Sequence, residues 1–310
     1  MVYSKGDSVS QYFNDSETFP TCVYESYIND FANPRMVFEQ YIMGENAAIA
    51  YQLEQFDSIG FDCVARCINN IIARGAVPES FIAEIPDAFA EQLIPGFVNG
   101  CMKGCCSLEI KTTTQGAISG TATGIYDMRD EHLRIKSGDR LIGLLSAGLH
   151  YEGLVKAVNI LKLDEENIKD IIPEIFCKME DELFRRSKVY VRPVMHLTKN
   201  MGIRLNGICH IGEKGFVKSI SEMIPDDITA KIWPEDFPIS GIYEMIAKQG
   251  NLSTMEMYNN FNMGVGLVMA VDKADAGNVM NSLIQIGEHP FVIGCCVDRK
   301  DANNAVELKW

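Results

Sequence analysis

The sequence contains no apolar run of the roughly 18 residues that a transmembrane helix needs. Its first residues, MVYSKGDSVSQYF, also lack the apolar segment of a secretory signal. Hydrophobic residues make up 47% and charged residues 23% of the 310 residues, which is the composition of a globular protein. A chain of this length accommodates about two domains. We therefore expect a soluble, cytoplasmic protein with no membrane partner.

Basic residues are scarce. The chain has 28 Lys and Arg against 42 Asp and Glu, which gives a net charge of −14. Binding to a nucleic-acid backbone requires a basic face, and this surface is expected to repel one. Between Met36 and Ala65 there are five acidic residues and no Lys or Arg. The composition therefore excludes nucleic acid as an expected partner.

The ten cysteines do not follow the spacing of a zinc site. Cys63 and Cys67 are four residues apart, as are Cys101 and Cys105, so each pair lies on one face of a helix. Free cysteine is commonly a small buried hydrophobic residue. We therefore expect reduced thiols in the core, no disulfide framework and no metal site.

Several catalytic motifs are also missing. There is no Walker loop, no G-x-S-x-G elbow, no H-E-x-x-H pair and no EF-hand loop. The glycines of FNMGVG (261–266) lead into an apolar strand, so close backbone packing explains them better than phosphate binding.

The pattern of apolar residues alternates between helix and strand periods in both halves of the chain. The main predicted helices cover 60–74, 86–104, 187–200, 215–223 and 273–288, and the main predicted strands cover 80–85, 116–127, 140–146, 207–211, 264–271 and 291–297. This order predicts an α/β (α+β) fold of two domains, residues 1–135 and 136–310. Residues 1–35 are polar and broken by prolines, which predicts an irregular arm.

Histidines follow two of the predicted strands. His210 in GICHIGEKGF precedes a loop that contains Glu213 and Lys214, and His150 follows the strand 140–146. A histidine, an acid and a lysine at a strand end are able to bind an anion or transfer a proton. A buried core histidine with solvated neighbours explains the same pattern, and both interpretations stay open.

Several stretches together resemble one family, the PurM-type AIR synthases (phosphoribosylformylglycinamidine cyclo-ligases). They are FDSIGFDCVARCINNIIARGAVP, GCMKGCCSL, SGDRLIGLLSAGLHYEGL, SKVYV, ICHIGEKGF and GNLSTMEMYNNFNMGVGLVMAV. They occur in the order and spacing of the family from about residue 56 onward. The resemblance implies a PurM-like fold of two α/β domains, a homodimer formed through the N-terminal halves, and binding of ATP and Mg²⁺.

The three phosphate-binding motifs of the family are altered in this sequence. Its Asp-Gly-Val-Gly-Thr-Lys loop corresponds to residues 41–46, with Tyr41 in place of the Asp and Asn46 in place of the Lys. Its Asn-Asp pair corresponds to Asn69–Asn70. Its Gly-Gly-Glu-Thr loop is expected after Leu108, where this chain is shorter and reads EIKTTTQ.

The second half of the chain keeps more of the family pattern. His150 and His210 stand in register, and Ser187 corresponds to a Thr. A Thr-Gly-Gly-Gly run of the family becomes residues 212–215, which include Lys214. The residues expected to bind a ligand are Asp62, Asn69, Asn70, His150, Ser187, His210 and Lys214, with His210 as the candidate catalytic residue.

The leading hypothesis from the sequence is a divergent homodimer that has lost the ATP-dependent cyclo-ligase activity. It would bind a small, phosphorylated or nucleotide-like ligand in a binding, scavenging or regulatory role. The alternative is an active cyclo-ligase with a remodelled ATP site, which would need ATP and Mg²⁺. Two further hypotheses are an ATP-independent enzyme that uses His210 with Glu213 or Lys214, and a purely structural subunit.

Overall fold

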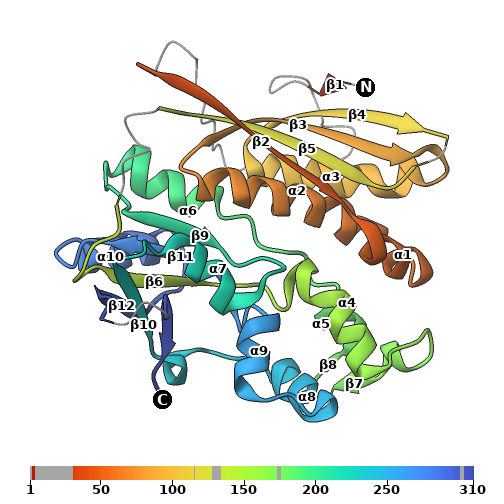
Figure 1. The fold of residues 1–310 in the computed structure, drawn as a ribbon. Coiled ribbons are helices and arrows are strands. Elements are labelled where there is room, and N and C mark those ends of the chain that lie inside the picture. Colours follow the sequence, from red (N-terminus) through yellow and green to blue (C-terminus); the bar gives the residue numbers. More distant parts are fainter. Residues whose placement is uncertain (1, 4–30, 115, 128–133, 173–175, 301–303) are drawn as a thin grey trace. The chain divides into compact units, whose positions relative to one another are not determined.

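The computed structural model describes residues 2–3, 31–114, 116–127, 134–172, 176–300 and 304–310 (Figure 1). The chain divides into two compact units. Unit 1 consists of residues 1–131 and 189–192, and unit 2 of residues 132–188 and 193–310. The short segment 189–192 thus belongs to unit 1 although it lies in the second half of the sequence.

Unit 1 is a five-stranded sheet covered on one face by helices α2 and α3 (Figure 1). The strand order is β1-β4-β3-β5-β2; β3 and β4 are parallel, and the other pairs are antiparallel. The elements are β1 (Val2–Tyr3), β2 (Pro34–Ile42), α1 (Gly44–Gln52), α2 (Phe56–Ala73), β3 (Val77–Pro86), α3 (Ala90–Gly104), β4 (Ser107–Thr113) and β5 (Ser119–Asp127).

The predicted irregular arm, residues 1–35, is wrong at both of its ends. Val2–Tyr3 pair with β4, and Pro34 and Arg35 begin the long strand β2. Pairing to a neighbouring strand supplies hydrogen bonds that the local sequence does not reveal. The rest of that prediction, residues 4–30, lies outside the described residues.

Helices α2 and α3 pack closely because both present apolar faces to each other and to the sheet. Ile68, Ile71 and Phe97 are fully buried. At Gly100 of α3, a Cβ atom would lie 2.7 Å from the Cβ of Val64, so only glycine permits this approach. The predicted helix 60–74 is therefore confirmed in its packing face, although α2 begins four residues earlier.

Unit 2 is built on a six-stranded sheet with the order β13-β10-β12-β6-β11-β9. All seven residues of β11 are buried, which fits its place between β6 and β9. The β10–β13 pair is parallel, and the other pairs in this sheet are antiparallel. The strands are β6 (Arg140–Leu145), β9 (Gly207–His210), β10 (Ile228–Ile232), β11 (Val265–Val271), β12 (Pro290–Asp298) and β13 (Val306–Leu308).

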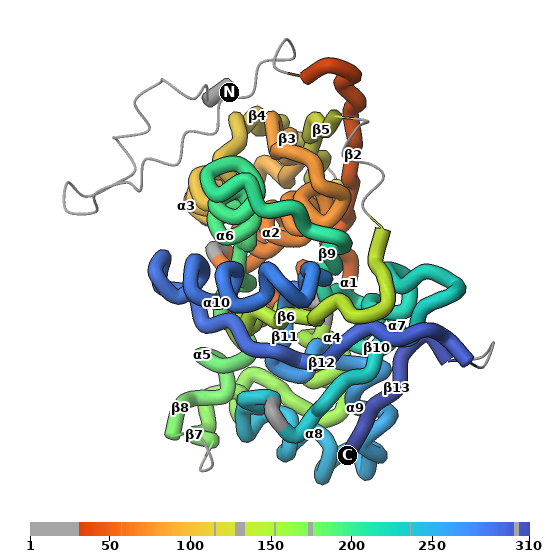
Figure 2. Tube along the Cα trace, turned by 90° about the vertical axis from the view of Figure 1, so that its left-hand side faces the viewer, coloured from red at the N-terminus to blue at the C-terminus, as the bar shows by residue number. Residues whose placement is uncertain are grey.

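Helices of unit 2 pack on this sheet and on one another. Figure 2 shows α10 running alongside β6 and β12, and α7 contacts both β9 and α9. The helices within this unit are α4 (His150–Leu161), α5 (Met179–Leu183), α7 (Gly215–Met223), α8 (Gly241–Gly250), α9 (Thr254–Asn260) and α10 (Ala276–Gln285). Helix α6 (Val191–Met195) begins in the unit 1 segment 189–192 and ends in unit 2. A small hairpin joins β7 (Ile171–Ile172) and β8 (Cys177–Lys178). The mixed α/β fold confirms the predicted fold class.

The helix predicted to start after an N-cap at Ser187 is wrong in its start. Residues 185–190 are not helical, and α6 begins at Val191. Pro193 is the third residue of α6, in the first turn, where the missing N–H would have no intrahelical partner. A short π-helix, His196–Asn200, follows.

Within the described residues, no helix combines the length and apolarity needed to cross a membrane. Nine of the cysteines are described there, and six of these are buried, as predicted for core thiols.

Candidate functional site

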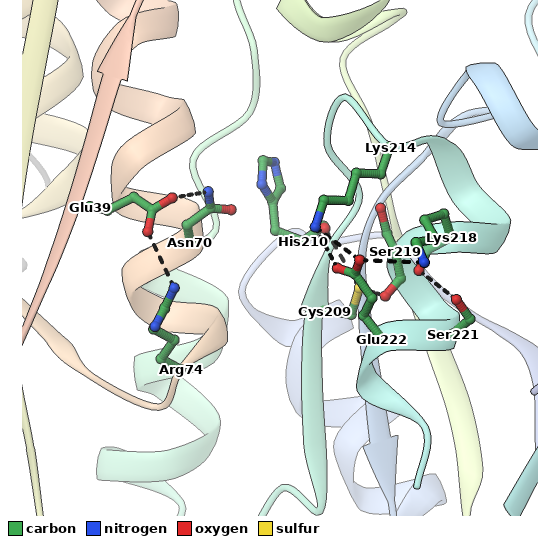
Figure 3. A network of polar contacts seen from close by, with 10 residues as sticks. All are labelled: Glu39, Asn70, Arg74, Cys209, His210, Lys214, Lys218, Ser219, Ser221 and Glu222. Atoms are coloured by element: carbon green, nitrogen blue, oxygen red, sulfur yellow. Dashed lines mark hydrogen bonds and ion pairs between the residues drawn. The ribbon is translucent and has the colours of Figure 1, made fainter. Parts of the chain in front are cut away.

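One face of α2 and its C-cap residue carry polar side chains at a spacing of four: Asp62, Arg66, Asn70 and the C-cap Arg74. This spacing places them in one row along the helix. The Asn70 side-chain amide donates a 2.8 Å hydrogen bond to Glu39 Oε1 on β2. The Arg74 guanidinium pairs with Glu39 Oε2 at 3.5 Å (Figure 3). Asn70, which replaces an Asp of the family motif, thus contacts an acidic side chain of the same unit.

Tyr41, the second altered position, also contacts a residue of this row. The guanidinium carbon of Arg66 lies 4.4 Å from the centroid of the Tyr41 ring, which is a cation–π contact. Tyr41 and Glu39 are two residues apart on β2 and therefore point to the same face of the sheet. Asp62, at the start of the row, is buried.

Asn69 makes a different kind of contact. Its side chain is 0% exposed, and its Oδ1 accepts a 3.0 Å hydrogen bond from the backbone N–H of Tyr190, which belongs to the same unit. Tyr190 is also fully buried. A buried N–H that loses its acceptor costs about 1–3 kcal/mol. Asn69 is therefore a structural acceptor that fixes the segment 189–192.

The resemblance places the third family motif, the Gly-Gly-Glu-Thr loop, after Leu108. In this structure strand β4 continues through Thr113, with Glu109 and Thr112 paired to β3. In the altered first loop, Asn46 Oδ1 is buried and has no hydrogen-bond partner among the described residues.

The α2 face does not fit a magnesium ion as it stands. Magnesium in nucleotide sites is held by one or two carboxylates together with phosphate oxygens. Both carboxylate oxygens of Glu39 already accept from donors, one of which is a guanidinium. In the part of the chain that the structure describes, no three His, Cys, Asp or Glu side chains are grouped to hold a metal ion.

In unit 2, His150 is 2% exposed and stands at the start of α4. Its Nε2 accepts hydrogen bonds from the backbone N–H groups of Ala147, at 3.0 Å, and of Lys188, at 3.4 Å. Burial, and secondarily the charge of Lys188, lowers the pKa of His150 to about 3. The imidazole is therefore neutral at pH 7, and its Nε2 is an acceptor engaged by the backbone.

Ser187 stabilises the first turn of α4 from a distance in the sequence. Its Oγ accepts a 3.4 Å hydrogen bond from the backbone N–H of Tyr151, one of the N–H groups that a helix cannot satisfy internally. The next residue, Lys188, forms a 2.5 Å ion pair with Glu288. The segment 187–188 and the start of α4 therefore hold each other in place.

A second set of contacts fixes the loop between β6 and α4. The carbonyl of Gly148 accepts hydrogen bonds from Ser146 Oγ at 2.7 Å, Asn262 Nδ2 at 3.0 Å and the Tyr243 hydroxyl at 3.1 Å. Burial raises the pKa of Tyr243 well above its usual value, so the hydroxyl stays protonated as a donor. Sequence reasoning missed Tyr243 and Asn262. The only signal was that Asn262 lies in one of the stretches that carry the family resemblance, GNLSTMEMYNNFNMGVGLVMAV.

The predicted anion-binding turn is internally paired. His210 is buried at the end of β9. Lys214 Nζ lies 2.8 and 2.9 Å from the two carboxylate oxygens of Glu222 on α7. Figure 3 shows the His210 ring pointing away from the Lys214–Glu222 pair. The pairing of His210 with Lys214 as acid and base therefore stays a hypothesis.

The predicted ligand residues fall into two sets. Asp62, Asn69 and Asn70 lie in α2 of unit 1. The residues His150, Ser187, His210 and Lys214 lie in unit 2. Within unit 2, His150 and Ser187 are brought together around the start of α4, while His210 and Lys214 lie at the turn between β9 and α7.

Comparison with solved structures shows a shared fold. The thiamine-monophosphate kinase from Stenotrophomonas maltophilia matches with a TM-score of 0.65 at 16% identity, over 89% of this chain and 86% of that one. A hydrogenase maturation protein, HypE, matches with a TM-score of 0.63 at 14% identity, over 99% of this chain and 91% of that one. At these identities the similarity concerns the fold alone.

Sequence comparison is more specific. Residues 136–305 match the family described as AIR synthase related protein, C-terminal domain. A phosphoribosylformylglycinamidine cyclo-ligase from Lachnospira eligens is 31% identical over 268 residues, which cover 81% of this chain and 78% of the relative. One from Clostridium botulinum (strain Loch Maree) is 33% identical over 295 residues, covering 90% and 85%. The chain belongs to the AIR synthase family.

Proposed function

We propose that the protein is a phosphoribosylformylglycinamidine cyclo-ligase with a remodelled phosphate-binding face. The observation that carries this proposal is the 31–33% identity to relatives of that name over 81–90% of the chain. The dense backbone contacts around His150 and Ser187 in unit 2 support it, because they fix a loop that the sequence resemblance identifies as retained. This activity was the alternative to the sequence-based hypothesis of lost activity, and the relatives favour it.

The remodelled face would bind phosphate groups in a different way from the family motifs. Positive charge on α2 comes from Arg66 and Arg74. Guanidinium groups bind phosphate oxygens in bidentate geometry and are always protonated. In this proposal the arginines neutralise charge that carboxylate-bound magnesium neutralises when the family motifs are intact.

Complementation tests the proposed activity in cells. A strain that lacks AIR synthase is transformed with this chain, with an active family member, or with an empty vector, and grown without purines. The proposal predicts growth with this chain. Absence of growth, with the protein present at the level of the active control, contradicts it.

A second candidate function is ligand binding without turnover. The observation that favours it is that Glu39 pairs with both Asn70 and Arg74, so the face that would hold phosphates is filled by its own side chains. Isothermal titration with ATP, with and without Mg²⁺, together with measurement of ADP release, separates the two functions. Binding without ADP release in the presence of phosphoribosylformylglycinamidine supports the second function, and release supports the first.

We also propose a homodimer formed through β2. This strand is at the edge of its sheet, and its outward residues Met36, Phe38 and Ile42 are 54%, 62% and 59% exposed. A long edge strand with exposed apolar side chains is prone to associate with another strand. Light scattering of the purified protein should give twice the mass of 34.6 kDa, and Phe38→Glu should shift it toward the monomer. A monomeric wild type contradicts the proposal.

A further inference from the structure

Lys156 lies in the middle of α4, and its ammonium group reaches two other segments of unit 2. Its Nζ donates to the carbonyl oxygen of Asn260 at 3.1 Å and to that of Glu213 at 3.4 Å. Asn260 is the last residue of α9, and Glu213 lies in the turn between β9 and α7. One side chain therefore joins three elements that are separate in the sequence.

The contact with Asn260 satisfies a helix end. The last carbonyl groups of a helix have no partner within it, and the helix dipole favours a positive charge there. α9 begins with a capping box in which Ser253 and Glu256 satisfy each other's backbone N–H groups. Its first turn is thus closed by its own residues, whereas its last residue is bound by a cation from α4.

Helix α7, which begins at Gly215 directly after the turn, contacts α9 (Figure 1). Gly215 has a φ of +76°, and a Cβ atom there would lie 2.1 Å from the carbonyl oxygen of Asn259. The backbone N–H of Phe216 donates to the carbonyl of Phe261 at 3.0 Å. Lys156 adds a third connection, through the carbonyl oxygens of Glu213 and Asn260.

Charge supports the same geometry. Lys156 is partly buried, and burial lowers the pKa of its ammonium group, while the nearby negative charge of Glu213 opposes that shift. A partly desolvated ammonium group forms stronger hydrogen bonds to carbonyl oxygens than an exposed one. Residues 212–215 of the turn carry an acid and a base, each of which interacts with an opposite charge: Glu213 with Lys156, and Lys214 with Glu222.

We propose that Lys156 is a positioning residue that fixes the turn 211–215, and with it the placement of two candidate ligand residues, His210 directly before the turn and Lys214 within it. This goes beyond the proposed cyclo-ligase activity, because it holds equally for a protein that only binds a ligand. Lys156 itself was not among the residues that the sequence identified.

Hydrogen exchange measured by mass spectrometry tests the proposal on the full chain. Lys156→Met keeps the aliphatic stem and removes the donor, so the peptide covering 207–218 should exchange on the order of five- to tenfold faster. Lys156→Arg keeps a cationic donor and should restore exchange to within about twofold of wild type. Lys248→Met, at an exposed position of α8, is the matched control and should leave exchange unchanged.

Three results would overturn the proposal. The first is unchanged exchange at 207–218 in Lys156→Met. The second is an arginine variant as fast as the methionine variant. The third is faster exchange across the whole of unit 2, including β11, which would make Lys156 a general contributor to stability. Because exchange needs no substrate, these results are independent of whether the cyclo-ligase activity is found.

Discussion

The α2 face of unit 1 and the loop around His150 in unit 2 are held together by different kinds of contact. On the α2 face, side chains contact side chains: Asn70 and Arg74 contact Glu39, and Arg66 contacts Tyr41. Around His150, side chains bind backbone groups, through His150 itself and Ser187. Asn69 resembles the second kind although it lies on α2.

This difference predicts which of these positions tolerate substitution. A partly exposed contact between two side chains is worth little, about 0–1 kcal/mol, so either partner is replaceable. A side chain that accepts from a buried backbone N–H is harder to replace. Its loss leaves the N–H group without a partner, which costs about 1–3 kcal/mol of stability. Tyr41 and Asn70, which the sequence resemblance implies are altered, make the first kind of contact, and Asn69 and His150, which it implies are retained, make the second.

The largest effect is expected for His150→Leu. This change removes the acceptor of two backbone N–H groups, so unfolding free energy should fall by about 3 kcal/mol. Urea denaturation measures it, and His289→Leu at an exposed histidine should have almost no effect. If His150→Leu lowers the unfolding free energy by less than about 0.5 kcal/mol, water satisfies both N–H groups. That result would contradict the contrast between backbone-binding and side-chain contacts.

Asn69→Leu should be the next most destabilising change, because the Tyr190 N–H is buried with its acceptor removed. We expect a loss of about 2 kcal/mol in the same urea experiment. The accompanying change should be faster hydrogen exchange at residues 189–192, the segment that Asn69 fixes. Equal exchange at 189–192 in the wild type and in Asn69→Leu would contradict the hydrogen bond from the Tyr190 N–H to Asn69 Oδ1.

The pH dependence of stability tests the state of His150 directly. Its pKa is about 3 in the folded protein and about 6.5 when unfolded, so between these values only the unfolded state takes up the proton. The contribution of neutral His150 to the free energy of unfolding is fully present above pH 6.5. It falls by up to about 1.4 kcal/mol per pH unit as the pH decreases toward 3. His150→Gln supplies an acceptor that does not titrate and should flatten this slope. Parallel slopes in the two proteins would contradict the lowered pKa.

The smallest effect is expected for Asn70→Leu, the same change one residue along α2 from Asn69. It removes the side-chain hydrogen bond to Glu39, so the expected loss is about 0.5 kcal/mol. The ratio of the two neighbouring variants therefore measures the contrast between backbone-binding and side-chain contacts. Equal losses of unfolding free energy in the Asn69 and Asn70 variants would contradict this contrast between the two kinds of contact.

Elements with strong periodicity were predictable from sequence. The predicted helix 215–223 coincides with α7, and the apolar run 264–271 became the buried strand β11. Strand β2 was not predicted, since its outward face mixes exposed apolar and polar residues and its backbone is paired along its whole length with β5, far away in the sequence. A local pattern does not reveal pairing with a strand far along the chain.

The candidate site was predictable in its residues more than in their roles. Asn69 and Asn70 are adjacent and chemically identical, yet one binds a backbone N–H and the other binds Glu39 on β2, 31 residues earlier. His150 was identified, but its role as an acceptor depends on Lys188, 38 residues later. Lys156 gave no signal, because its partners are carbonyl oxygens that every residue carries.

Turnover by the purified protein tests the proposed activity most directly. The chain is incubated with ATP, Mg²⁺ and phosphoribosylformylglycinamidine, and ADP and the ring-closed product are quantified against an active family member. The account predicts ADP release that requires the substrate and is matched by ring-closed product. ADP release no faster than in a blank without protein would contradict the cyclo-ligase assignment, provided that a urea denaturation curve shows the protein to be folded.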